Sequence, residues 1–412
     1  MADTVASDAH VPAGPRYLAA LALAVFLLKV GMALFTYGST DVLIFEADLA
    51  KIRQDSGAAL YRDGITTRWC GATGQRPCPP FNHPPFMIHA LEGWGALSDI
   101  SGLPLRFWLR FTCAAADVGS LALLLRMLRS RRSDPKTRTA LALFAASPIA
   151  ILISGFHGNT DAILIFFMLL SIWLVESRRA AWLAGAALGM AVNIKILPIL
   201  LAPAALLALA GTRRRREFGA GAVAVFLAGS LPILAEAPEL VITRVFGYGS
   251  QAGAWGLSLL ALASAKSPHF AWLHDLHAGY GRIVSLCLVL GASFWPRPRP
   301  SRNALFMRTG FVMFVFLSLA PGFGVQYLAW LVPWVVALGA RPTAMYYVAG
   351  SVFLLAYYTA AAGRFPWYLA NSLERPAWTA LVIFLGLTCW VVVCGIALVY
   401  LRALRASRAD PA

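Results

Sequence analysis

The chain has 412 residues, of which 59% are hydrophobic and only 13% are charged, and its formal net charge is +16. Soluble domains average about 25% charged residues, so this composition excludes a water-soluble protein. It also disfavours a nucleic-acid partner, because the Lys and Arg residues stand in short runs between long apolar blocks. That pattern is typical of the cytoplasmic loops of a membrane protein.

Apolar blocks recur from Tyr17 to Tyr400. A bilayer-spanning helix needs roughly 20 apolar residues, so these blocks predict an all-α, polytopic transmembrane bundle of about twelve spans over residues 16–400. Residues 1–15 are expected to be a disordered cytoplasmic N-terminus, and 401–412 a cytoplasmic tail. The expected spans are 17–37, 105–127, 139–155, 161–176, 181–194, 196–210, 219–236, 281–295, 309–321, 326–339, 343–361 and 377–400.

Basic runs predict the orientation of the bundle. If the spans alternate, all these runs fall on one side, which the positive-inside rule assigns to the cytoplasm together with both termini. Two long loops, residues 38–104 and 237–280, then lie on the outer side, where each is expected to carry a helix at the membrane surface. The basic runs are residues 126–138, 176–179, 212–217, 297–302 and 401–408.

Carboxylates gather at the start of the first outer loop. Asp41 follows the first span, and Glu46 and Asp48 come next at near-helical spacing. Asp41 and Asp48 are about two helical turns apart and so share one face, either as a functional pair or as solvated caps of a surface helix. Farther along this loop, Cys70 and Cys78 predict either a disulfide in an oxidising compartment or a pair of free thiols.

Two further segments place polar side chains near the membrane. In FNHPPF (81–86), the two prolines hold Asn82 and His83 rigidly. In GFHGNTD (155–161), His157, Asn159 and Asp161 lie between apolar blocks. Polar groups at that depth are costly and usually belong to a site or pathway. For both segments, a simple turn between helices is the alternative.

Several cations also lie among apolar residues. Lys195 either holds a lipid phosphate or extends to the interface. Arg364 has the same two interpretations, because Trp367 beside it is a typical interfacial anchor. Within the first two spans, Asp117 is expected to pair with a nearby cation, either Lys29 or Arg110.

In this order, the segments resemble the GT-C superfamily of membrane glycosyltransferases. TDVLIFEAD follows the first span, NHPPF stands where the family has Tyr-Pro-Pro, and RFTCAAADV matches an Arg…Asp pattern. SPIAILISGFHGNTD is similar to a Pro…His-containing segment, NIKILP to Asn-x-Lys, and GVQYLAWLVPW stands where eukaryotic members have His-Glu-Lys before an apolar run and Pro. The likeness covers about residues 17–340 and is nearest to the dolichyl-phosphate-glucose-dependent glucosyltransferases and the polyprenol-phosphate-mannose-dependent mannosyltransferases.

The resemblance implies a glycosyltransferase that moves a hexose, mannose or glucose, from a polyprenyl phosphate to a hydroxyl of a glycan, lipid or protein acceptor, with inversion. Asp41, at the place of the family's first-loop Asp, is the implied catalytic base. The site would face the periplasm or the lumen of the endoplasmic reticulum. The expected substrate-binding residues are Glu46, Asp48, Asn82, His83, His157, Asn159, Asp161, Lys195, Gln326, Tyr327 and Arg364.

Two questions stay open at this level. No compact Asp-x-Asp motif follows the first span, so a divalent metal is not indicated, although a metal requirement is not decided. The alternative function is a multi-span transporter or lipid flippase. Transporters usually show internal repeats and polar residues at mid-membrane, whereas here the polar residues gather on one side, which favours an interfacial enzyme.

Overall fold

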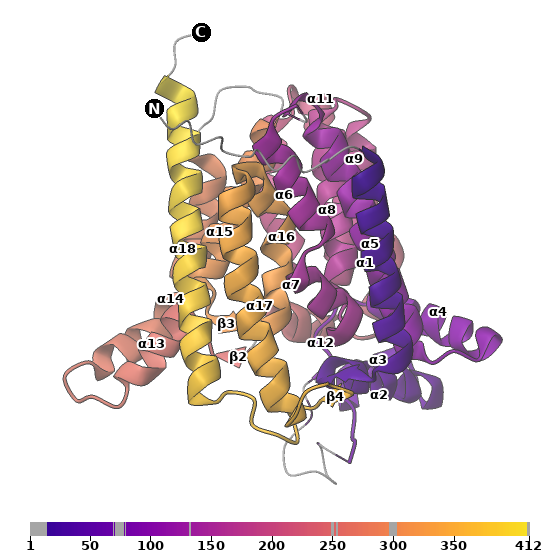
Figure 1. Ribbon diagram of the computed structural model, residues 1–412. Helices are drawn as coiled ribbons and strands as arrows, with labels where there is room; N and C mark the ends of the chain where they lie inside the picture. Colours follow the sequence, from indigo (N-terminus) through magenta and orange to yellow (C-terminus); the bar gives the residue numbers. More distant parts are fainter. Residues whose placement is uncertain are drawn as a thin grey trace.

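Long helices stand side by side through the molecule, and shorter elements lie across one end of them (Figure 1). The computed structural model describes residues 15–68, 70, 78, 80–131, 133–248, 251–252, 254–295 and 303–409. The expected basic run at 297–302 and nearly all of the expected N-terminal tail lie outside these described residues.

Within that described part, seven helical stretches are long and apolar enough to cross a membrane. A helix suits lipid because it pairs its backbone N–H and C=O groups internally. The chain is therefore an integral membrane protein, as its composition predicts. The seven stretches are α1 (Pro15–Phe35), α5 (Leu105–Met127), the joined α6 (Pro135–Ala145), α7 (Pro148–Ala150) and η2 (Ile151–His157), α11 (Thr212–Glu236), α14 (Ala271–Phe294), α17 (Ala340–Ala362) and α18 (Ala380–Ala409).

The remaining helices of the bundle are shorter. α9 has 14 residues and so rises only about 21 Å, less than the roughly 30 Å hydrocarbon core of a bilayer. The predicted number of crossings therefore stays a prediction. These shorter helices are α8 (Asp161–Glu176), α9 (Ala181–Ile194), η3 (Leu197–Leu201), α10 (Ala202–Ala208), α15 (Ala304–Leu319), η5 (Val325–Leu331), α16 (Val332–Val335) and η6 (Val336–Leu338), with η1 (Arg129–Arg131) in a loop.

α9 and α10 are joined by a turn at Lys195 and have their other ends at the same end of the bundle. Arg214, at the start of α11, donates to the carbonyl of Arg179 just before α9 (2.9 Å). Its neighbour Arg215 donates to the carbonyl of Leu209 just after α10 (3.1 Å). The first residues of α9 and the last residues of α10 therefore both lie beside the start of α11. The turn between the two helices, at Lys195, lies inside the protein.

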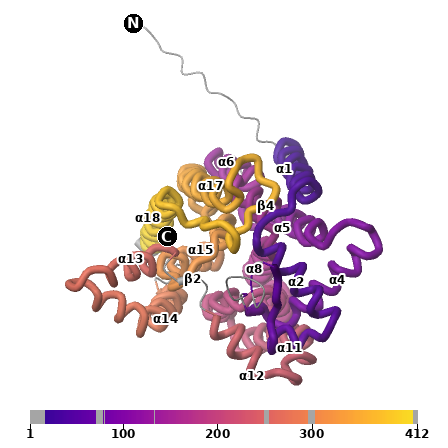
Figure 2. Tube along the Cα trace, turned by 90° about the horizontal axis from the view of Figure 1, so that it is seen from below, coloured from indigo at the N-terminus to yellow at the C-terminus, as the bar shows by residue number. Residues whose placement is uncertain are grey.

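The two expected outer loops supply a layer at the end of the bundle opposite both termini (Figure 1). Seen from that end, α2 and α4 lie on one side and α13 and α14 on the other (Figure 2). The layer contains α2 (Thr40–Gln54), α3 (Gly57–Asp63), α4 (Phe86–Ser101), α12 (Pro238–Val241), η4 (Ile242–Phe246) and α13 (Gly256–Ser264). β1 (Gly38–Ser39) pairs in parallel with β4 (Leu369–Ala370), and β2 (Gln251–Ala252) pairs antiparallel with β3 (Gly322–Phe323).

Two boundaries in this layer differ from the prediction. The loop at 38–104 holds an additional helix, α4, which Pro84 and Pro85 begin. The loop at 237–280 is shorter than expected, because α14 begins at Ala271 rather than at 281. The first turns of α14 read AWLHDLHAGY, and this mixture of polar and apolar residues hides the start of a long helix from a hydropathy reading.

Buried charges connect the first helices. Lys29 of α1 forms an ion pair with Asp117 of α5 at 2.6 Å, and Ser154 of η2 donates to the same carboxylate at 2.6 Å. The sequence allowed either Lys29 or Arg110 as the partner of Asp117, and in the structure the partner is Lys29. Three elements are thereby joined at a point where lipid could not solvate an unpaired charge.

Arg110 of α5 has a wholly buried side chain that binds backbone carbonyls instead of a carboxylate. Its Nη2 donates to the carbonyls of Ala33 (3.0 Å) and Thr36 (2.7 Å), and its Nη1 donates to Thr36 Oγ1 (2.9 Å). Nη1 also reaches the carbonyl of Phe156 (3.4 Å). The flat guanidinium fork therefore connects the end of α1 with η2 and α5.

We expect Arg110→Lys to lower the free energy of unfolding by about 2–3 kcal/mol, because an ammonium cannot reach all of these carbonyls and some stay buried without a donor. Thermal unfolding of the purified protein in detergent would measure the loss. Arg106→Lys is the matched control on the same helix, since Arg106 is partly exposed and pairs with Glu46. Equal stability of the two variants would contradict this role of Arg110.

Candidate functional site

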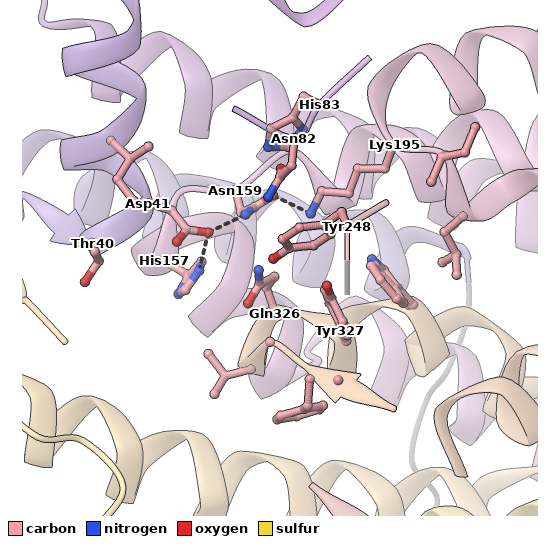
Figure 3. Close-up of a pocket in the computed structure, with 18 of the residues that line it drawn as sticks. Thr40, Asp41, Asn82, His83, His157, Asn159, Lys195, Tyr248, Gln326 and Tyr327 are labelled. Carbon is pink, nitrogen blue, oxygen red and sulfur yellow. Dashed lines mark hydrogen bonds and ion pairs between the residues drawn. The ribbon is translucent and has the colours of Figure 1, made fainter. Parts of the chain in front are cut away.

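A cavity of about 890 Å³ opens at the end of the bundle that carries α2. Its size falls within the usual range for small-molecule sites. Asp41, Asn159 and Lys195 lie next to one another in it, with Asn82 and His83 beside them (Figure 3), and apolar side chains also line it. The polar and aromatic residues that line it include Thr40, Asp41, Asp48, Asn82, His83, His157, Asn159, Lys195, Tyr248, Arg282, Gln326, Tyr327, Trp330, Tyr357 and Trp378.

Three chain reversals of the bundle bring five of these groups to the cavity. The first, between η2 and α8, carries His157 and Asn159. The second, between α9 and η3, carries Lys195, and the third, between α15 and η5, is followed at once by Gln326 and Tyr327. Because the chain reverses at the cavity, the polar ends of these helices meet there and their apolar stretches remain in the bundle.

Asp41 lies in the first turn of α2, where the helix dipole favours an anion. Ser39 caps this helix: its Oγ accepts from the Asp41 N–H (3.2 Å) and donates to the carbonyl of His157 (2.7 Å). The start of α2 is thereby held against the end of η2. Gly158, with φ of +78°, makes the reversal that directs the following residues back toward Asp41.

Two neighbours hydrogen-bond the Asp41 carboxylate. The ring Nε2 of His157 donates to Asp41 Oδ2 (3.0 Å), and the amide of Asn159 donates to the same oxygen. Burial alone would raise the pKa of Asp41, but the charge and hydrogen bond of His157, the amide of Asn159 and the charge of Lys195 lower it to about 2. The hydroxyl of Tyr358 lies 3.0 Å from Nδ1 of His157, and this contact orients the imidazole ring. Asp41 is therefore a carboxylate at every physiological pH.

Lys195 extends this network across the cavity wall. Its Nζ donates to Asn159 Oδ1 (2.9 Å) and to Asp161 Oδ1 (2.7 Å), and it lies 5.8 Å from the ring of Trp330. Trp330 also donates to Asp161 Oδ1 (2.6 Å). Asp161 itself is completely buried behind the wall. A cation is thereby held beside the Asp41 carboxylate, with Asn159 bonded to both.

The segment before α4 lines the cavity beside Lys195 (Figure 3). His83 Nδ1 lies 3.2 Å from the carbonyl of Ile194, next to Lys195, and its ring contacts Phe45 and Phe81. Burial, and then the charge of Lys195, lower the pKa of His83 to about 4. This imidazole is therefore neutral near pH 7, and it offers the cavity a hydrogen-bonding group without a charge.

The structure brings most of the predicted site residues together, but three lie elsewhere. Glu46 turns away from the cavity to Arg106 (3.3 Å) and the hydroxyl of Tyr37. Asp161 supports Lys195 from behind the wall. Arg364 follows Gly363, which ends α17 with φ of +80°, and its side chain is exposed outside the cavity. Those that line the cavity are Asp41, Asp48, Asn82, His83, His157, Asn159, Lys195, Gln326 and Tyr327.

Cys70 and Cys78 form a disulfide, the first of the two alternatives for this pair. They belong to the segment between α3 and α4, at the cavity end of the molecule. Among the residues that the structure describes, no group of three or more His, Cys, Asp or Glu side chains has the arrangement of a metal site.

The sequence reading missed several residues of the site. Arg282 lies on α14 and donates to the carbonyls of Phe246 and Gly247 while it lines the cavity. Its signal was present, since it is a cation next to the apolar run IVSLCLVL. Trp330 and Tyr358 stand within predicted apolar spans, and only their hydrogen bonds in the structure distinguish them from packing residues.

Comparison with known proteins assigns this architecture to a family. The family model of glycosyltransferase family 87 matches residues 81–320, which is more than half of the chain. The match begins after Asp41, includes the first two chain reversals and Arg282, and ends at the start of the third reversal. No curated protein matches the chain. The chain belongs to glycosyltransferase family 87 and is a membrane glycosyltransferase.

Proposed function

We propose that this enzyme transfers a hexose, mannose or glucose, from a polyprenyl-phosphate donor to an acceptor hydroxyl, with inversion, and that Asp41 is the catalytic base. One observation carries the proposal: the Asp41 carboxylate and the Lys195 ammonium share a cavity wall and are joined through Asn159. Base and cation are the two groups that such a displacement requires.

In the proposed reaction, the acceptor oxygen attacks the anomeric carbon while the bond from that carbon to the phosphate oxygen breaks. The acceptor proton passes to Asp41, and the polyprenyl phosphate leaves with its additional negative charge near Lys195. A carboxylate of low pKa is sufficient here, because the hydroxyl becomes acidic as it bonds to an oxocarbenium-like carbon. His157 and Asn159 hold Asp41 in place and leave its second oxygen free to approach the acceptor.

Apolar side chains support a lipid-linked donor. One wall of the cavity consists of Leu197 and Leu200 of η3, Leu286 and Val289 of α14, and Phe316 of α15. Leu286 is half exposed on α14, a helix long and apolar enough to cross a membrane. A polyprenyl chain could lie along this wall while its phosphate reaches Lys195, and Arg282 of α14 would add a second cation.

The charge distribution and the disulfide support a cavity that faces away from the cytoplasm. The basic residues around Arg129, Arg179 and Arg214 lie at the end of the bundle opposite the cavity, where positive-inside orientation places the cytoplasm. The Cys70–Cys78 disulfide, at the cavity end, suits an oxidising compartment. The proposed location is a bacterial inner membrane, with a periplasmic site, or the endoplasmic reticulum, with a luminal site.

Membership of a glycosyltransferase family favours this enzyme over the transporter or flippase that the sequence also allows. The test is an assay of the purified protein in proteoliposomes with a panel of polyprenyl-phosphate hexoses and pentoses and an acceptor that cannot cross the membrane. We expect transfer from a polyprenyl-phosphate hexose, a product of inverted anomeric configuration by NMR, and turnover only where the acceptor faces the cavity end. Use of a nucleotide sugar, or retention of configuration, would refute the proposal.

A further inference from the structure

Asp48 is a buried carboxyl group that the proposed chemistry leaves unused. Its side chain is 2% exposed and lines the cavity. Within the described residues it forms no hydrogen bond and no ion pair, unlike Asp41, which has two donors. Buried polar groups are nearly always paired in native proteins, so an unpaired one that borders a cavity points to a partner that is absent from the protein itself.

The surroundings of Asp48 decide its charge. Burial raises its pKa to about 8, and no neighbouring cation offsets that effect. The charged and titratable groups that line the same cavity are Asp41, His83, His157, Lys195, Tyr248, Tyr327, Tyr357 and Arg282. Asp48 is therefore mostly protonated near pH 7, and a neutral carboxylic acid can both donate and accept a hydrogen bond. Sugar hydroxyls have the same double capacity.

Its position along α2 suggests which substrate it meets. Asp48 lies seven residues after Asp41, which is about 10 Å along the same helix face. That distance is roughly the span of two linked sugar rings. The donor phosphate belongs at Lys195, which is carried by the turn after α9 and not by α2, whereas the attacking hydroxyl of the acceptor must lie against Asp41 on α2. The acceptor is therefore the substrate that can extend along α2.

On the basis of the proposed function, we infer that Asp48 is a specificity-determining residue that hydrogen-bonds a hydroxyl on the second sugar of a glycan acceptor. The first sugar presents its hydroxyl to Asp41, and the second lies against Asp48. The enzyme then prefers acceptors of at least two sugar units to single sugars.

Matched acceptors test this inference. The wild-type enzyme and its variants are assayed with the active polyprenyl-phosphate sugar and with octyl glycosides that carry one or two mannose units, and in parallel with octyl glucoside and octyl maltoside. We expect the wild type to have at least a tenfold higher kcat/KM for a two-sugar acceptor. Asp48→Leu should lower that value about 10- to 100-fold, and the value for the one-sugar acceptor less than threefold. Asp48→Asn can still donate and accept a hydrogen bond, so it should lower kcat/KM for the two-sugar acceptor less than tenfold.

Asp55→Asn and Asp55→Leu are the controls, because Asp55 is an exposed carboxylate at the end of the same helix and pairs with Lys51. They should leave the preference for two sugars unchanged. An absence of preference in the wild type, or an equal loss on both acceptors in Asp48→Leu, would overturn the inference. The comparison of one-sugar and two-sugar acceptors with the wild-type enzyme tests the inference even if Asp48→Leu fails to fold.

Infrared spectroscopy separates this inference from the proposed function. The carbonyl band of a protonated carboxylic acid should be present in the wild type at neutral pH, be absent from Asp48→Asn and remain in Asp55→Asn. Its absence from the wild type would refute the neutral acid even in an active enzyme. A protein that shows the band but transfers sugar to no acceptor would refute the proposed function, and the acceptor subsite with it.

Discussion

Asp41→Asn is expected to lower kcat by about 100- to 10,000-fold, with a much smaller effect on KM, because the amide cannot take the acceptor proton. The substitution keeps the size of the side chain, and the cap of α2 depends on Ser39 rather than on Asp41. Steady-state kinetics with the active donor would measure the loss. Glu46→Gln is the matched control, since Glu46 lies on the same helix but turns away from the cavity.

The pH dependence follows from the direction of the pKa shift. The pKa of Asp41 is lowered from its ordinary value near 3.8 to about 2, so the charged form is present above both values and is lost only as the pH falls through about 2. We therefore expect no loss of kcat/KM through protonation of Asp41 between about pH 5 and pH 8. A fall of kcat/KM as the pH is lowered from about 8 to about 5 would contradict Asp41 as the base.

Lys195→Met is expected to damage both stability and catalysis. Asp161 is completely buried, and its Oδ1 accepts hydrogen bonds from Lys195 and Trp330. Removing the cation leaves that carboxylate without its counter-charge, which typically costs about 3–5 kcal/mol of folding free energy when a buried pair is broken. Transfer should also fall, because the leaving phosphate loses the cation that the proposed reaction places beside it.

A double variant separates the two effects. In Lys195→Met/Asp161→Asn no buried charge is left unpaired, so thermal unfolding in detergent should recover toward the wild type while kcat/KM stays low. Lys51→Met is the control: Lys51 pairs with Asp55 at the surface, and its loss should change neither property. Recovery of activity together with stability in the double variant would show that Lys195 acts only on the fold.

Hydropathy predicts the long helices of this protein because the requirement behind it is local. A segment such as α1 or α18 has to satisfy its own backbone in lipid, whatever its neighbours are. The blocks predicted at 181–194 and 196–210 correspond to α9 and to η3 with α10, because the break at Lys195 interrupts the apolar run. The same method misses the start of α14, whose first turns mix polar and apolar residues.

The amino-acid sequence by itself determined that this is an integral membrane protein. It also allowed Asp41, His157 and Lys195 to be named as candidates, because polar residues are rare among apolar ones. Only the tertiary structure decided which of them meet. His157 and Asp41 are separated by 116 positions in the chain, and the same packing turns Glu46 toward Arg106 and leaves Arg364 in solvent. Long-range contacts depend on how every helix packs, and no local pattern encodes that.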